Sequence, residues 1–221
     1  MAHPAASDSR PNRYSVREEM ANAITHGTGI VAALVGLVVL TTYASAHGTA
    51  VHLVSSLVFG FSLVVLYTAS TVYHSIQAPA VKSVLRVIDH ASIFILIAGT
   101  YTPFTLITLQ GTLGWWLFGI IWGLAVFGIL FEIFLIDKWK VGSLVLYAGM
   151  GWCIVFAIKP LLASLPTGGV VLLFLGGLFY TGGIAFYVWR RLPYHHAIWH
   201  LCVLAGSVCH FFSILFFVIP S

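Results

Sequence analysis

Residues 114–136 read GWWLFGIIWGLAVFGILFEIFLI, and Glu132 is the charged residue among them. The run is continuously apolar and about twenty residues long, which is the length an α-helix needs to cross a hydrocarbon core of roughly 30 Å. A transmembrane β-strand would instead alternate apolar and polar residues over about ten positions. The stretch therefore predicts a transmembrane helix.

Similar apolar runs precede and follow this stretch, separated by short gaps that are rich in glycine, proline and polar residues. They cover residues 22–44, 50–73, 88–108, 141–162, 168–189 and 197–219. Over the whole chain, 60% of the residues are hydrophobic and 7% are charged, whereas soluble domains carry about 25% charged residues. We expect an all-α bundle of seven transmembrane helices, in one domain over residues 18–221, after a flexible cytoplasmic tail over residues 1–17.

The first apolar run also has features of a cleaved signal peptide. Ala44-Ser45-Ala46 resembles a signal-peptidase site, and arginines precede the run. The run is longer than the usual apolar core of about 7–15 residues, however, and polar residues occupy its start, among them Asn22 and His26. We therefore expect the first helix to be retained.

The lysines and arginines alternate from gap to gap. Of the 10 such residues, all except Lys159 lie in the tail or in the gaps after the second, fourth and sixth runs. Cytoplasmic loops carry this excess of positive charge. The pattern predicts a cytoplasmic N-terminus and an outside C-terminus, in a multi-pass protein of the plasma or inner membrane. Charges spread over short gaps do not indicate a nucleic-acid partner, and membrane lipids are the expected partners.

Small residues within the apolar runs leave the oligomeric state open. Gly119-x3-Gly123 and Gly149-x-Gly151 indicate close helix packing, within one chain or between chains. Cys153, Cys202 and Cys209 also lie within apolar runs. We expect them to be small buried hydrophobic residues without a disulfide.

Four ionisable residues lie at ends of the apolar runs, where such side chains are costly and mark a site by default. His74 closes the second run, Asp89 opens the third, and His196 and His200 open the seventh. In the predicted orientation all four residues lie near the inner leaflet. The orientation follows from lysines and arginines alone, so the shared depth of these four residues is an independent observation. This agreement predicts one shared site.

The three histidines suit a metal ion. His196 and His200 are four residues apart and leave one helix face, as two ligands of one ion do. His74 would supply a third imidazole, and four-coordinate zinc would then keep one position for a water whose pKa falls to about 7. Asp89 could hold or deprotonate that water, and Ser70, one turn before His74, could hydrogen-bond it or a substrate carbonyl. Three imidazoles also suit copper or nickel.

Other histidines fit plainer roles. A histidine at a helix end is usually an interfacial polar residue, and His26, His90 and His195 crowd the same face without requiring a function. His210 follows His200 by ten residues, which is about 15 Å along a helix, so it cannot join the same ion. We expect it to hydrogen-bond a neighbouring helix.

Several stretches resemble motifs of the hemolysin III family, which belongs with the progestin and adipoQ receptors, a group of seven-helix proteins that includes the adiponectin receptors. The stretches are EEMANAITHG at 18–27, Ser70-x3-His74, DHASIF at 89–94, AGTYTPF at 98–104, and His196-x3-His200 followed by His210-Phe211. They occur in order from about residue 18 to the end of the chain.

The resemblance implies a zinc ion near the cytoplasmic face, held by His74, His196 and His200. It implies that Asp89 and Ser70 act through the metal-bound water in a ceramidase-like hydrolysis of a lipid. The short tail lacks the long N-terminal region of the animal receptors, which argues against hormone reception. The family name refers to lytic activity. The sequence lacks the pattern of a soluble, secreted pore-former, so we do not expect lysis by such a mechanism.

Three functions remain open on the sequence. The first is a zinc-dependent membrane hydrolase acting on a lipid amide or ester bound within the bundle. The second is a receptor-like protein, or one in membrane-lipid homeostasis, with a structural zinc that pins the helices. The third is a transporter or pore, which the clustering of polar residues at one face disfavours.

Overall fold

The computed structural model describes residues 14–135 and 139–220, apart from the side chain of Lys140. Within those residues seven helices are long and apolar enough to cross a membrane, and no strand is present, so the predicted all-α architecture is confirmed. The elements are α1 (Val16–His47), α2 (Ala50–Ser75), α3 (Pro79–Pro103) with η1 (Phe104–Leu109), α4 (Gly111–Leu135), α5 (Lys140–Gly151) with η2 (Cys153–Ala157) and α6 (Ile158–Ser164), α7 (Thr167–Val188), and α8 (His195–Ser213) with η3 (Ile214–Val218).

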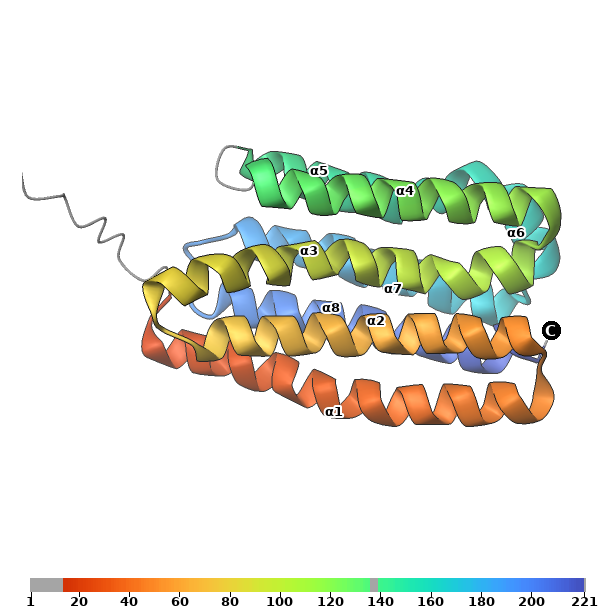
Figure 1. Cartoon of the computed structure of the whole chain (residues 1–221), viewed down its shortest axis with the longest axis horizontal. Helices are drawn as coiled ribbons and strands as arrows, with labels where there is room; N and C mark the ends of the chain where they lie inside the picture. Colours follow the sequence, from red (N-terminus) through yellow and green to blue (C-terminus); the bar gives the residue numbers. More distant parts are fainter. Residues whose placement is uncertain (1–13, 136–138, 221) are drawn as a thin grey trace, which may run out of the picture.

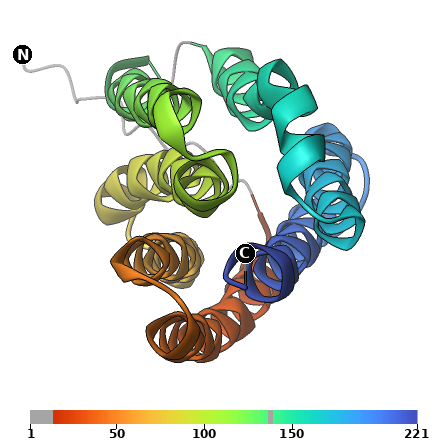
Figure 2. The same ribbon diagram turned by 90° about the vertical axis from the view of Figure 1, so that its right-hand side faces the viewer.

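The helices run side by side along one axis (Figure 1). Viewed along that axis, the spans form a ring in chain order, and contacts between α1 and α8 close it (Figure 2). The starts of α1, α3 and α8 and the end of α2 lie at one end of the bundle (Figure 1). This arrangement brings together the three ends at which the sequence places its four ionisable residues, and the start of α1 lies beside them.

The first helix begins earlier than the sequence analysis expects. Ser15 caps α1: its backbone N–H donates to Oε2 of Glu18 at 2.9 Å, and the backbone N–H of Glu18 donates to Oγ of Ser15 at 3.3 Å. Such a capping box satisfies backbone donors that the first turn would otherwise leave free. Tyr14, just before the cap, is buried. Residues 14–17 of the expected tail therefore belong to the fold, and the rest of that tail lies outside the described residues.

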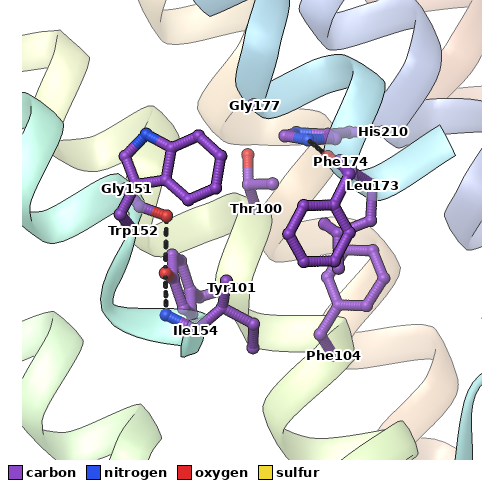
Figure 3. A pocket seen from close by; sticks show the side chains of 10 residues that line it. All are labelled: Thr100, Tyr101, Phe104, Gly151, Trp152, Ile154, Leu173, Phe174, Gly177 and His210. Carbon is purple, nitrogen blue, oxygen red and sulfur yellow. Dashed lines mark hydrogen bonds between the residues drawn. The ribbon is translucent and has the colours of Figure 1, made fainter. Parts of the chain in front are cut away.

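The fifth span is not the continuous helix that the sequence predicts over residues 141–162. It changes from α5 to the 3-10 stretch η2 and then to α6. Pro160 has no N–H to donate to the carbonyl four residues earlier, which weakens a regular helix there. The hydroxyl of Tyr101 from α3 donates to the carbonyl of Gly151 at 2.7 Å and accepts the N–H of Ile154 at 2.8 Å (Figure 3). One side chain thus pairs two backbone groups freed by the break.

At the glycine pairs singled out in the sequence, no other helix among the described residues approaches the α-carbon closely. A β-carbon at Gly119, Gly123, Gly149 or Gly151 would meet no atom within 4 Å among the described residues. Close approach occurs at other glycines, such as Gly128, where a β-carbon would overlap the ring of Phe94. The three cysteines are free thiols, and each is partly exposed, whereas the sequence analysis expects buried residues.

Candidate metal centre

Three buried histidines converge where the end of α2 meets the start of α8. His74 lies in the last turn of α2, and His196 and His200 lie in the first turns of α8. One ring nitrogen from each histidine lies within 4.8 Å of the others. The spacing in α8 and the position of His74 thus place three imidazoles around one point, as the sequence predicts.

The donor set fits a tetrahedral metal ion. Nε2 of His74 and Nε2 of His196 are 3.2 Å apart. Two nitrogens bound to one zinc at about 2.0–2.1 Å with tetrahedral angles would be about 3.4 Å apart. Nε2 of His200 is buried and has no hydrogen-bond partner among the described residues. A cation bound by all three Nε2 atoms would satisfy this nitrogen and replace the close contact between the other two.

The opposite nitrogen of each ring is held by the N-terminal part of the chain. Nδ1 of His74 donates to Oε2 of Glu19 at 2.6 Å. Nδ1 of His196 lies 3.1 Å from the hydroxyl of Tyr14. Nδ1 of His200 is held by two neighbouring groups of α1, the carbonyl of Asn22 at 3.2 Å and Oγ1 of Thr25 at 3.1 Å. Partners on Nδ1 fix the tautomer and the orientation of a ligating imidazole, so all three Nε2 atoms are aimed at one point.

Lys82 ties this support to the next helix. Its ammonium group lies 2.9 Å from Oε1 of Glu19. It also donates to the last carbonyls of α2, those of Tyr73 at 3.0 Å and Ile76 at 3.2 Å. A cation at a helix C-terminus is favourable because carbonyls without helical partners gather there. Lys82 therefore links Glu19 to the end of α2. One of the carbonyls that it binds, that of Tyr73, belongs to the residue before His74.

Asp89 and Ser70 are both buried at this end of the bundle. Oδ2 of Asp89 lies 3.5 Å from Nδ1 of His90, and the side chain lines the cavity that enters the bundle. Oγ of Ser70 has no hydrogen-bond partner among the described residues. Ser70 sits one turn before His74 on α2, so both residues leave the same helix face. Their roles in catalysis stay predictions.

His26 is part of the site, although the sequence analysis gives it no role. Its ring stacks on that of His200, with centroids 3.5 Å apart and planes 10° apart. Both of its ring nitrogens are buried without a hydrogen-bond partner among the described residues, and the side chain lines the cavity. Glu19, Asn22 and His26 follow one another at helical spacing on the buried face of α1. This spacing of polar residues at the start of an apolar run is the signal that could have identified them.

The other two histidines of this region have ordinary backbone partners. Nδ1 of His90 donates to the carbonyl of Arg86 at 2.9 Å, one turn earlier in α3. Nδ1 of His195 donates to the carbonyl of Phe186 at 3.1 Å, near the end of α7. These bonds give both rings a local backbone partner; the sequence analysis assigns neither residue a function.

A cavity lies inside the bundle beside the centre, and His26, whose ring stacks on His200, is among the residues that line it. Its walls come mainly from α3, α5, α7 and α8, and atom-free space within and at its mouth amounts to about 970 Å³. His26 and Asp89 line one part of it, and Thr100 and His210 line another. Most of the remaining lining is aliphatic or aromatic. The cavity is therefore suited to an apolar chain whose polar group lies near the histidines.

Comparison with known proteins identifies the family of the chain. The sequence profile described as "Haemolysin-III related" matches residues 14–211. "Hemolysin-3" of Bacillus cereus is 50% identical over 206 residues, which cover 93% of this chain and 94% of that protein. "Hemolysin-3 homolog" of Bacillus subtilis is 48% identical over 206 residues, with 93% and 97% covered.

A human protein is similar over almost the same length. "Monocyte to macrophage differentiation factor" of Homo sapiens is 30% identical over 220 residues, which cover 96% of this chain and 87% of that protein. The profile match spans the N-terminal support, the three histidines and the cavity. With seven apolar helices in the structure, the chain is a multi-pass integral membrane protein and belongs to the haemolysin III-related family.

Proposed function

We propose that the protein is a zinc-dependent membrane hydrolase that cleaves a lipid amide or ester, in the manner of a ceramidase. The observation that carries the proposal is the convergence of three buried imidazole nitrogens within 4.8 Å of one another, where Nε2 of His200 has no hydrogen-bond partner in the described part of the chain. Zinc accepts three such ligands in catalytic sites and keeps a fourth position open. His74, His196 and His200 would hold the ion.

The metal supplies one kind of chemistry: when bound, zinc lowers the pKa of a water to about 7 and polarises a carbonyl. The protein's own groups carry the remaining roles. Asp89 would take a proton from the attacking water and return it to the leaving amine or alcohol as the carbonyl–heteroatom bond breaks. Ser70 would donate a hydrogen bond from Oγ to the substrate carbonyl, since that hydroxyl has no other partner among the described residues.

The cavity supports a lipid as substrate. Its apolar lining would remove the chain of a lipid from water, while Asp89 and His26 line its polar part. The scissile group would then lie between the histidines and Asp89. A soluble, fully polar substrate would gain nothing from such walls. The cavity is thus consistent with an amide or ester of a long-chain acid.

The test is turnover of a short-chain fluorescent ceramide, and of a matched ester, by the purified protein in mild detergent. Wild type loaded with zinc is expected to release the acid, and His74→Ala and Asp89→Asn are expected to lose this activity. Asp89→Asn should keep its zinc, because Asp89 is not a ligand in this proposal. Zinc retained in wild type without hydrolysis of either substrate would favour the alternative, a structural zinc in a receptor-like or lipid-homeostasis protein.

A further inference from the structure

His210 lies in the cavity at a different depth from the metal centre. It follows His200 by ten residues of α8, which corresponds to about 15 Å along the helix axis. The side chain is buried, and it contributes to the walls of the cavity near Thr100. Figure 3 shows the imidazole among aromatic and aliphatic neighbours, with the hydroxyl of Thr100 close by. A polar ring is thus placed deep in an apolar chamber.

One edge of the His210 ring is fixed against α7. Nε2 lies 3.0 Å from the carbonyl of Leu173 (Figure 3). Because a carbonyl only accepts, Nε2 carries the proton in the neutral ring. The same edge packs on Gly176, where a β-carbon would overlap Cδ2 and Nε2 of the imidazole. The absence of a side chain at Gly176 therefore lets His210 reach Leu173.

The other nitrogen of His210 is an acceptor without a donor. Nδ1 is buried and has no hydrogen-bond partner among the described residues. A neutral imidazole with its proton on Nε2 accepts at Nδ1. The nearby hydroxyls are already engaged: those of Tyr67 and Tyr180 both meet Oγ of Ser207, at 2.7 and 2.8 Å. Buried acceptors are rarely left unpaired, so this position calls for a donor from the cavity.

We propose that the cavity selects lipids with a hydroxyl group on the chain, about 15 Å from the metal centre, and that Nδ1 of His210 accepts the hydrogen bond from that hydroxyl. The inference rests on the proposed function only for placing the reacting carbonyl at the histidines. It narrows the substrate class from any long-chain lipid to one hydroxylated in mid-chain. An unsubstituted chain would fit the apolar walls but leave the acceptor unpaired.

The test is binding, which does not require turnover. The probes are octadecanoic acid and a series of hydroxyoctadecanoic acids that differ in hydroxyl position, competing with a fluorescent fatty acid on the detergent-solubilised protein. Wild type is expected to bind a mid-chain hydroxy acid roughly three- to tenfold more tightly than the plain acid, the worth of one neutral hydrogen bond. A hydroxyl close to the carboxylate should bring no gain.

Two variants of His210 test whether this residue causes the preference for hydroxylated acids. His210→Phe keeps a ring of similar size but has no acceptor, so it is expected to bind all acids of the series alike. His210→Gln retains an acceptor and should recover part of the preference. Tyr43→Phe is the matched control outside the cavity, and it should keep the preference because Tyr43 lies on α1 and is not among the residues that line the cavity.

Each outcome of the binding experiment either supports or contradicts the inference. Equal affinity of wild type for hydroxylated and plain acids would overturn it and would indicate that water satisfies Nδ1. A preference that survives in both His210 variants would overturn the assignment to His210. Hydrolysis without any hydroxyl preference would contradict this inference alone, whereas a preference without hydrolysis would support it and contradict the proposed function.

Discussion

Oε2 of Glu19 lies 2.6 Å from Nδ1 of His74, so the first turn of one span and the last turn of the next are joined by a charged hydrogen bond. The other carboxylate oxygen of Glu19 lies 2.9 Å from Nζ of Lys82. Both partners of the bond are buried. Glu19 therefore orients the ring so that Nε2 of His74 faces the other two histidines, with Nδ1 as the donor nitrogen of the neutral ring.

Replacing Glu19 by glutamine should weaken metal binding without unfolding the bundle. The amide keeps the size of the side chain but loses the charge that holds His74 and Lys82. Loss of such a partner typically costs about 10- to 100-fold in metal affinity. Competition with a zinc-binding dye measures the change. Glu18→Gln is the matched control, because the carboxylate of Glu18 accepts hydrogen bonds from Ser15 and from the N–H of Tyr194, and no hydrogen bond among the described residues joins it to the three metal-site histidines. Equal affinities for the two variants would contradict the role of Glu19.

His26→Phe should separate metal binding from catalysis. Phenylalanine keeps an aromatic ring stacked on His200 but has no ring nitrogens to meet a polar group in the cavity. We expect the variant to retain its zinc and to lose about tenfold in kcat/KM, from the loss of a hydrogen bond to substrate. Zinc content and lipid hydrolysis are measured on the same preparation. Loss of zinc together with activity would instead make His26 part of the support of His200.

Tyr101→Phe tests the broken fifth span. Removing the hydroxyl leaves the carbonyl of Gly151 and the N–H of Ile154 without their shared partner, in a region with little access to water. An unpaired buried group costs about 1–3 kcal/mol, so the variant should unfold at lower temperature. Thermal unfolding in detergent measures the shift. Tyr43→Phe, a change on a half-buried residue of α1, should have a smaller effect; similar melting of the two variants would count against the bridging role.

The orientation in the membrane is still a prediction from the charges, and it can be tested by labelling. Ser83→Cys lies near the start of α3 and Gln110→Cys lies between η1 and α4, and both positions are exposed at opposite ends of the third span. A membrane-impermeant thiol reagent added to intact cells should label the cysteine at 110 and reach the one at 83 only after permeabilisation. The reverse pattern would place the histidines at the outer face.

The spans, and the ionisable residues that stand out at their ends, were predictable from the sequence, whereas contacts that depend on a side chain from another helix were not. Continuous apolar runs define each helix because the bilayer demands length and hydrophobicity. His74, His196 and His200 stand out because ionisable side chains are costly there. The break in the fifth span depends on Tyr101 from another helix, which no local pattern shows.

The support of the histidines was missed for a related reason. Tyr14 and Glu19 lie at the border between a polar segment and an apolar run, where exposed polar residues are common. Only the ring closure of α1 against α8 brings Tyr14 to His196, and only the pairing of α1 with α2 brings Glu19 to His74. Their roles follow from tertiary contacts between residues that are far apart in the sequence.

The most direct test of the account is the metal content of the protein. Wild type and the double variant His196→Ala/His200→Ala are purified in mild detergent without chelator and analysed by mass spectrometry for bound metals, with His195→Ala as the control at an adjacent histidine. We predict about one zinc per chain in wild type and in the control, and little in the double variant, because one ion needs its three imidazole ligands. A well-folded wild type that holds no metal would contradict the metal centre and the hydrolase proposed on it.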